Sequence, residues 1–173
     1  DDRRVLSNID PLHFAARKGP DGSPLSVEVA GPRERIFFDP SKTKAAIVTC
    51  GGLCPGINDV IRAVVMELYH RYGVGNILGI RFGFQGLIPK FGHPVLELTP
   101  DVVKDIHGLG GSFLSSSRGR QDVGEMVEAL RRMNVDIFFC IGGDGTMRAA
   151  EHITREIQRR KLNIGVIGIP KTI

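Results

Sequence analysis

Gly142-Gly143-Asp144-Gly145-Thr146 brings three glycines and one carboxylate together in five residues. Glycines let backbone N–H groups approach a phosphate closely, and a helix that starts here would add its positive N-terminal end. The carboxylate of Asp144 alone would repel a phosphate. It therefore indicates a divalent cation, because Mg²⁺ prefers one or two carboxylates together with phosphate oxygens. Thr146 could cap the helix or offer its hydroxyl to the ligand. A plain glycine turn with an aspartate cap is the alternative interpretation.

Other residues of suitable chemistry lie elsewhere in the chain. Gly51 and Gly52 form a second glycine turn, Arg118 lies in a serine-rich stretch, and Lys171 comes close to the last printed residue. Two glycine turns, a carboxylate, an arginine and a lysine suit a polyphosphate with a metal. Neither turn has the G-x-G-x-x-G spacing of dinucleotide-binding folds, and no G-x-x-x-x-G-K-[ST] motif is present, so a P-loop is excluded.

Short apolar segments alternate with amphipathic ones, and this alternation predicts the elements that must position these residues. Asn58 or Asp59 is expected to cap the first helix, and Thr99-Pro100 is expected to open a short one. The expected strands are 45–50, 76–82, 95–98, 136–141 and 165–169, and the expected helices cover 58–68, a few residues from 99, 123–133 and 146–157.

Strands that alternate with helices predict an α/β fold with a doubly wound parallel sheet and helices on both faces. In such sheets ligands bind outside the carboxyl ends of the strands. We therefore expect both glycine turns, Arg118 and residues 170–172 to meet at one edge. Residues 1–43 are polar and rich in turn residues, so we predict an N-terminal extension there, with one short strand at Arg35–Phe38, and a domain at 44–173.

The composition excludes several classes of protein. The chain has 173 residues, 42% of them hydrophobic, and a formal net charge of +4, as is ordinary for one globular domain. Its basic residues are scattered, so we expect no nucleic-acid partner. No apolar run reaches the length of a membrane span and no signal peptide is visible, so we expect no membrane partner. Three cysteines, an odd number, favour a reducing compartment, and we expect the cytoplasm.

Four segments together resemble the phosphofructokinase family, in its order and at its approximate spacing. They are residues 51–58 (GGLCPGIN), 110–118 (GGSFLSSSR), 141–146 (IGGDGT) and 168–173 (GIPKTI). The resemblance runs from about Lys44 to the last residue. The wording of residues 49–62 resembles the branch that holds pyrophosphate-dependent enzymes and their ATP-using relatives.

The resemblance implies a Rossmann-like, three-layer nucleotide-binding domain and an allosteric enzyme of glycolysis that binds ATP, Mg²⁺ and fructose 6-phosphate. It implies catalytic roles for Lys171 and Thr172, with Lys171 neutralising charge on the phosphoryl group and Thr172 contacting the sugar phosphate. It implies that Asp144 holds the metal. The nucleotide-binding residues that it implies are Gly51, Arg118, Gly119, Gly143, Asp144, Gly145 and Thr146.

The family continues after Thr-Ile with Asp-Asn-Asp, whose first aspartate is the general base, whereas the printed sequence ends at Ile173. We therefore expect the chain to be the N-terminal part of a longer enzyme, a homodimer or homotetramer. Pyrophosphate remains open as the donor, because pyrophosphate-dependent relatives share a lysine at position 171. A non-catalytic nucleotide-binding domain also remains open. The Gly-Gly-Asp-Gly-Thr motif alone also resembles lipid and NAD kinases, but the other three segments argue against those.

Overall fold

The computed structural model describes residues 4–6, 18–19, 21–29, 31 and 35–171, which fall into two compact units, 1–37 and 38–173. In the first unit, β1 (Arg4–Leu6) pairs antiparallel with β2 (Ser26–Glu28). The guanidinium of Arg4 donates to the hydroxyl and the carbonyl of Ser26, at 2.9 and 2.7 Å. The strand predicted at Arg35–Phe38 is wrong, because these residues bend and join no strand ladder among the described residues.

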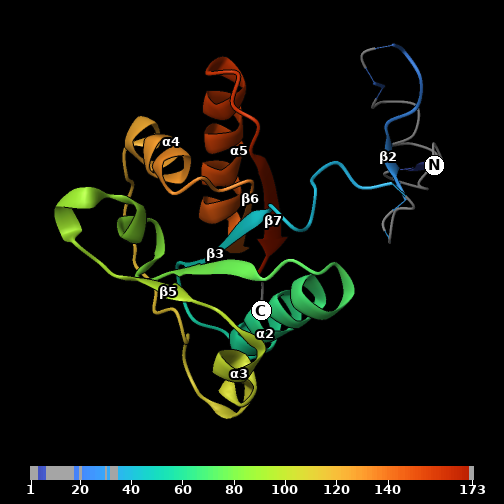
Figure 1. The fold of residues 1–173 in the computed structure, drawn as a ribbon. Helices are drawn as coiled ribbons and strands as arrows, with labels where there is room; N and C mark the ends of the chain where they lie inside the picture. The colour runs from blue at the N-terminus through green and yellow to red at the C-terminus, as the bar shows by residue number, and fades with distance from the viewer. Residues whose placement is uncertain (1–3, 7–17, 20, 30, 32–34, 172–173) are drawn as a thin grey trace. The chain divides into compact units, whose positions relative to one another are not determined.

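The second unit is built on a five-stranded sheet with the order β5-β4-β3-β6-β7 (Figure 1). Its strands are β3 (Lys44–Cys50), β4 (Asn76–Ile80), β5 (Val95–Glu97), β6 (Ile137–Gly142) and β7 (Gly165–Pro170). Four strands run parallel, and β5 runs antiparallel to β4. The sheet is therefore not fully parallel. A parallel connection from β4 to β5 would require a crossover segment such as a helix, but the chain between them contains only 3₁₀ turns, at Gly83–Leu87 and Pro89–Phe91.

Helices cover both faces of this sheet, which confirms the predicted α/β architecture (Figure 1). On one face lie α4 (Val123–Arg132) and α5 (Asp144–Arg159). On the other lie α2 (Ile57–Met66), which continues as a π-helical turn over Glu67–Arg71, α3 (Pro100–Val103) and a 3₁₀ turn at Ile106–Gly108. In the part of the chain that the structure describes, no helix is long and apolar enough to cross a membrane.

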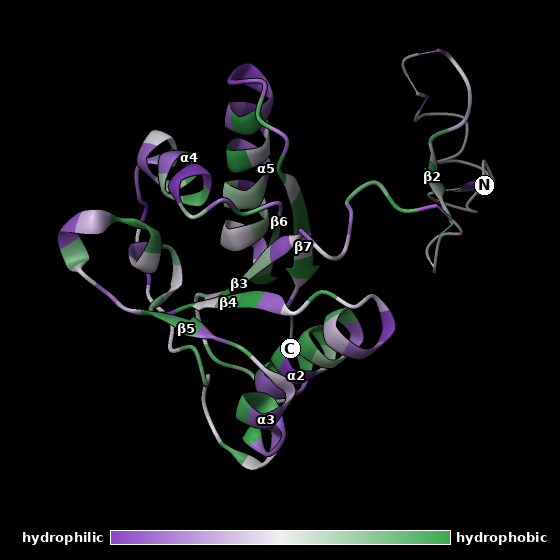
Figure 2. Cartoon of the chain, viewed as in Figure 1, coloured by the Kyte–Doolittle hydropathy of each residue, from purple (hydrophilic) through white to green (hydrophobic). Residues whose placement is uncertain are grey.

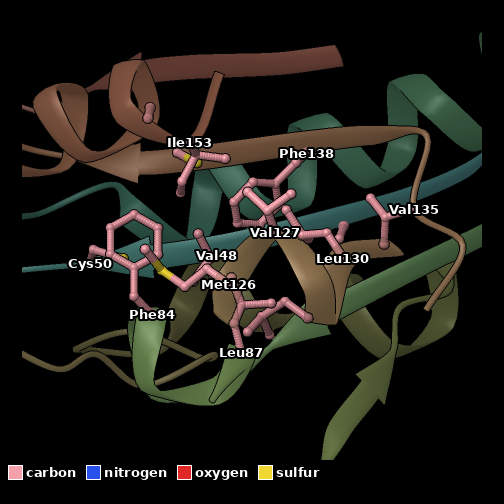
Figure 3. Packing of buried hydrophobic residues seen from close by; sticks show 14 of the residues in the cluster. Val48, Cys50, Phe84, Leu87, Met126, Val127, Leu130, Val135, Phe138 and Ile153 are labelled. Carbon is pink, nitrogen blue, oxygen red and sulfur yellow. The ribbon is translucent and has the colours of Figure 1, made fainter. Parts of the chain in front are cut away.

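The sheet separates two hydrophobic clusters, as expected for strands that are buried on both sides. Figure 3 shows the cluster between the sheet and α4 and α5, where Val48 and Phe138 from the strands meet Val127, Leu130 and Ile153 from the helices. The other cluster joins the second side of the same strands to α2 and α3. Figure 2 shows that α5 carries both hydrophilic and hydrophobic residues, as expected of the amphipathic helix that the sequence predicts there.

Two of the predicted helix starts can be compared with the structure. Thr99 caps α3, since its hydroxyl accepts the N–H of Val102 at 3.3 Å, and Pro100 follows it as predicted. The prediction that Asn58 or Asp59 caps α2 is wrong. The cap position is Gly56, with a left-handed φ of 85°, and Asn58 is buried inside the helix. Its amide instead bridges to the loop before α4, accepting the N–H of Phe113 at 2.7 Å and donating to the carbonyl of Leu109 at 3.0 Å.

The direction in which the chain adds strands to the sheet reverses between β3 and β6. From β3 the chain crosses by α2 to β4 on one side, and from β6 it crosses by α5 to β7 on the other. In doubly wound sheets the crevice at such a switch point is where ligands bind. Here the ends of these two strands lie side by side, with Cys50 opposite Gly142.

Candidate functional site

The turn from β6 into α5 forms one part of the candidate site. Gly143 takes the cap position in an extended conformation, and the N–H groups of Thr146 and Met147 turn back to its carbonyl at 2.8 and 3.0 Å. Asp144 is the first residue of the helix, and both Asp144 and Gly145 are exposed. An exposed carboxylate at the start of a 16-residue helix is available to a cation, while the free N–H groups of the first turn remain available to an anion.

Thr146 does not cap α5, so that part of the prediction is wrong. It lies in the first turn with only 5% of its surface exposed, and its side chain fills the space beside Gly142. A Cβ on Gly142 would collide with the Thr146 hydroxyl and would lie 2.9 Å from the carbonyl of Cys50. A role for the Thr146 hydroxyl toward a ligand stays a prediction, and the packing against Gly142 is its visible function.

Gly145 differs from Gly142 in its surroundings. A Cβ built on Gly145 meets no heavy atom within 4 Å, and its φ lies outside the left-handed region. The described part of the protein would therefore accept a side chain at position 145. Its being glycine is consistent with space that a ligand needs.

The turn after β3 forms the second part of the site. Gly51 has a φ of 82°, which favours glycine. Its N–H donates to the carbonyl of Ser117 at 3.3 Å, and its carbonyl accepts the hydroxyl of Ser116 at 2.6 Å. The Nη2 atom of Arg118 lies 3.7 Å from where a Cβ of Gly52 would be. The structure thus brings Gly51 and Arg118 together, as the sequence predicts.

A pocket of about 450 Å³ opens between this turn and the serine-rich loop. It is lined by Gly51, Gly52, Leu53, Ser112, Ser115, Ser116, Ser117 and Arg118. Gly119 follows Arg118 with a φ of 102° and is exposed, but it is outside this lining. Asp144, Gly145 and Lys171 are likewise outside it. In the described residues the two glycine turns are neighbours at the carboxyl ends of the central strands, and they do not form the walls of one closed pocket.

Lys171 lies beside the β6–α5 turn. Its N–H donates to the carbonyl of Gly142 at 2.8 Å, and its own carbonyl lies 3.7 Å from where a Cβ of Gly143 would be. These contacts extend the pairing of β7 with β6, in which Pro170 lies opposite Gly142. Thr172, predicted to contact the sugar phosphate, lies outside the described residues.

The one acidic residue of the candidate site, Asp144, suits a metal ion that is held mainly by the phosphates of a bound substrate. Among the described residues, no group of three or more His, Cys, Asp or Glu side chains could hold a metal ion. A single exposed carboxylate, Asp144, fits Mg²⁺, which keeps waters and takes its other ligands from substrate phosphates. The residues present therefore fit Mg²⁺ that arrives with a polyphosphate, and they do not form a metal site of their own.

The buried cysteines supply no nucleophile. Burial raises the pKa of the Cys50 thiol to about 12, and burial, followed by the nearby Cys50, raises the pKa of Cys140 well above its usual value. Both thiols therefore stay protonated at neutral pH, whereas a reactive cysteine requires a lowered pKa. All three cysteines are free, as expected for a chain without a disulfide framework.

Sequence reasoning missed a group of hydroxyls that join the two sides of the pocket. Thr49 is 1% exposed, and its hydroxyl lies 2.8 Å from both the Ser112 hydroxyl and the Ser115 carbonyl. A threonine inside an otherwise apolar strand was the available signal, because a buried hydroxyl requires a partner.

Comparisons with known proteins give the family and the fold of the chain. The model of the phosphofructokinase family matches residues 44–173. Curated relatives include an ATP-dependent 6-phosphofructokinase of Borreliella burgdorferi, 53% identical over 156 residues, which are 90% of this chain and 35% of the relative. The enzyme of the same name from Entamoeba histolytica is 55% identical over 147 residues, 85% of this chain and 34% of the relative.

A relative from Arabidopsis thaliana, ATP-dependent 6-phosphofructokinase 4, chloroplastic, is 51% identical over 144 residues, 83% of this chain and 27% of the relative. The chain thus spans roughly a third of the length of the curated relatives that it matches.

Two solved structures share the fold at low sequence identity. A pyrophosphate-dependent phosphofructokinase from Marinobacter aquaeolei gives a TM-score of 0.67 at 22% identity, over 75% of this chain and 33% of the other. The Pichia pastoris phosphofructokinase in the T-state gives 0.66 at 23% identity, over 83% of this chain and 16% of the other.

Proposed function

We propose, because this chain belongs to the phosphofructokinase family, that it is the N-terminal, nucleotide-binding part of an ATP-dependent 6-phosphofructokinase. The full enzyme would transfer the γ-phosphoryl group of ATP to the 1-hydroxyl of D-fructose 6-phosphate. The observation that carries the proposal is the pairing of Cys50 with Gly142, after which both glycine turns emerge at the switch point of the sheet. Relatives about half identical to this chain bear the name ATP-dependent 6-phosphofructokinase.

The two glycine turns would hold the phosphates of the donor. Gly51 would present its backbone to the ligand, Arg118 would supply positive charge beside Gly52, and Gly119, which follows Arg118, would contact the nucleotide. Gly143, Gly145 and Thr146 belong to the start of α5, whose N–H groups favour negative charge. Phosphoryl transfer depends mainly on such positioning and on electrostatic stabilisation.

Asp144 would hold Mg²⁺, which would neutralise charge on the transferring phosphoryl group when it is bound with the donor. Lys171, hydrogen-bonded by its backbone to Gly142, would add a second positive charge near the same group. Thr172 would contact the sugar phosphate. The proton of the sugar hydroxyl would pass to a base beyond the printed sequence, which the family resemblance implies.

ATP is the proposed donor because of Gly145. A carboxylate side chain at this position would enter the space for the α-phosphate and repel it, whereas pyrophosphate has no α-phosphate. Pyrophosphate-dependent relatives resemble this chain but carry aspartate there. Lys171 favours the second candidate, pyrophosphate, since that group shares it. Steric exclusion of ATP by a side chain at position 145 would discriminate between the donors more strongly than the positive charge of Lys171.

The test is a coupled assay of the full-length protein with fructose 6-phosphate and either ATP or pyrophosphate. We expect fructose 1,6-bisphosphate with ATP, and at least tenfold lower kcat/KM with pyrophosphate. A preference for pyrophosphate would establish the second candidate. Nucleotide binding without turnover of either donor would instead support the non-catalytic domain.

The assembly and the compartment are further parts of the proposal. We expect a homodimer or homotetramer, which light scattering of the full-length protein would measure. The three free cysteines support the cytoplasm. One relative is named as chloroplastic, so imaging of the tagged full-length protein is the appropriate check.

A further inference from the structure

The loop that carries Arg118 is attached to the sheet at defined points. In the turn after β3, the Gly51 carbonyl accepts the Ser116 hydroxyl at 2.6 Å and the Gly51 N–H donates to the Ser117 carbonyl at 3.3 Å. Two residues after β4, the N–H of Phe82 donates to the carbonyl of Leu114 at 2.9 Å. Arg118 itself is exposed, so its place depends on these contacts rather than on burial of its own side chain.

Thr49 attaches the same loop to β3 through its side-chain hydroxyl, a group that the apolar residues around it lack. It lies on the face of β3 that also carries Ala45 and Ile47, whose side chains belong to the cluster under α2. A hydroxyl has one proton and two lone pairs. Thr49 donates its proton to the Ser115 carbonyl at 2.8 Å. The Ser112 hydroxyl lies 2.8 Å from the Thr49 oxygen and 3.4 Å from the same carbonyl, so its shorter hydrogen bond is the one that it donates to Thr49.

The carbonyl that Thr49 holds belongs to a residue in an unfavourable conformation. Ser115 has a φ of 59°, in the left-handed region that side chains other than those of Gly, Asn and Asp seldom adopt. Such conformations persist where the surroundings hold them, and they concentrate at functional sites. The bend at Ser115 directs the next three residues along Gly51 toward Gly52, where the Arg118 guanidinium lies.

We propose that Thr49 is a positioning residue for the phosphoryl-donor site: its hydroxyl, oriented by Ser112, holds the Ser115 carbonyl and thereby keeps Arg118 over Gly52. This inference rests on the proposed function for its catalytic consequence. It adds a residue that touches no substrate and acts through Arg118. Its effect should therefore appear in the use of the donor and not in the affinity for the sugar phosphate.

The experiment compares Thr49→Val, which keeps the shape and removes the hydroxyl, with Thr49→Ser, which keeps the hydroxyl, in the full-length enzyme. We expect Thr49→Val to lower kcat/KM for ATP about tenfold, as loss of one buried hydrogen bond can do, with KM for fructose 6-phosphate unchanged. Thr49→Ser should stay within about twofold of the parent. In an Arg118→Ala background, adding Thr49→Val should lower kcat/KM for ATP by less than about twofold, because the effects of residues that act as a unit are not additive.

A second readout does not depend on activity. Trypsin should cut after Arg118 several times faster in Thr49→Val than in the parent. Thr154→Val is the matched control, since it removes a 2.8 Å hydrogen bond from a threonine hydroxyl to the Ala150 carbonyl in α5. If circular dichroism shows that Thr49→Val does not fold, Ser112→Ala replaces it in the experiment, because Ser112→Ala removes the group that orients Thr49.

The proposal is overturned if Thr49→Ser is as impaired as Thr49→Val. It is also overturned if the loss is equally large with and without Arg118, or if Thr154→Val speeds cleavage at Arg118 equally. A parent enzyme without activity toward ATP would refute the proposed function. The trypsin comparison would still decide whether Thr49 holds the loop.

Discussion

Gly142 and Gly145 lie three residues apart and are glycine for different physical reasons. At Gly142 the protein itself leaves no room, because the Thr146 side chain and the Cys50 carbonyl occupy the space of a Cβ. At Gly145 the protein leaves the space open. The first glycine is therefore required by the fold, and the second is available for a functional requirement.

Gly145→Asp in the full-length enzyme should raise KM for ATP and lower kcat/KM at least tenfold, a loss of about 1.4 kcal/mol or more. The added carboxylate would repel the α-phosphate while the fold is unchanged. Steady-state kinetics with each donor measure this, and Gly75→Asp, exposed at the opposite edge of the sheet before β4, is the control. ATP use equal to that of the parent would contradict the donor proposal.

Asp144→Ala in the full-length enzyme should reduce turnover by several powers of ten, because the metal that offsets transition-state charge would lose its protein ligand. The fold should survive, since Asp144 is exposed. Asp101→Ala, an exposed carboxylate in the first turn of α3, should leave turnover near that of the parent. Near-normal turnover of Asp144→Ala with a native circular dichroism spectrum would refute the assignment.

At the scale of elements, the β6–α5 junction has little freedom. Gly142→Ala should destabilise the protein by about 1–3 kcal/mol, as overpacking of a filled site does. It should also displace the first turn of α5. The free energy of unfolding of Gly145→Ala, in the same turn, should stay within about 0.5 kcal/mol of that of the parent. Thermal or urea unfolding of both variants measures the difference, and equal stabilities would show that the junction can relax.

Two sets of ion pairs, one within α4 and one at the carboxyl end of α5, respond to pH. Hydrogen bonds from Arg131, with Arg132 beside it, lower the pKa of Glu128 to about 2, and Arg159 and Arg160 lower that of Glu156 to about 2. Because the folded pKa values lie below the usual 4.5, this stabilisation is present above about pH 4.5 and is lost as the pH falls toward 2.

We therefore expect Tm to fall between pH 5 and pH 2.5 more steeply in the parent than in a Glu128→Gln/Glu156→Gln variant. The difference should be small, since these are surface pairs, and 1 M NaCl should reduce it further. Identical pH profiles at low salt would show that the pairs contribute nothing measurable.

At the scale of the whole molecule, the described domain presents surfaces that a larger assembly could cover. Ile167 on the outermost strand β7 is 43% exposed, and Leu53 and Leu109 beside α2 are 57% and 58% exposed. An open strand edge and exposed large apolar side chains both favour association.

Residues 1–173 expressed alone should therefore show no phosphotransfer, at most weak nucleotide binding, and a tendency to aggregate. The base that the family resemblance implies lies outside this sequence. A coupled assay and light scattering of the purified fragment measure these properties, with the full-length enzyme as control. Formation of fructose 1,6-bisphosphate by the fragment would contradict the assignment of roles.

The sequence alone determined most elements of the domain and the end of the sheet where the glycine turns meet, because both depend on neighbours in the chain. Apolar runs predicted β3, β4, β6 and β7, and strand-to-helix alternation predicted the edge at which the glycine turns meet. What only the tertiary structure decided depends on residues that are far apart. Thr49 meets Ser115 across 66 residues, and Asn58 meets Leu109 across 51. Local periodicity carries no signal for such pairs, so the Asn58 cap prediction was wrong and the hydroxyls around Arg118 were missed.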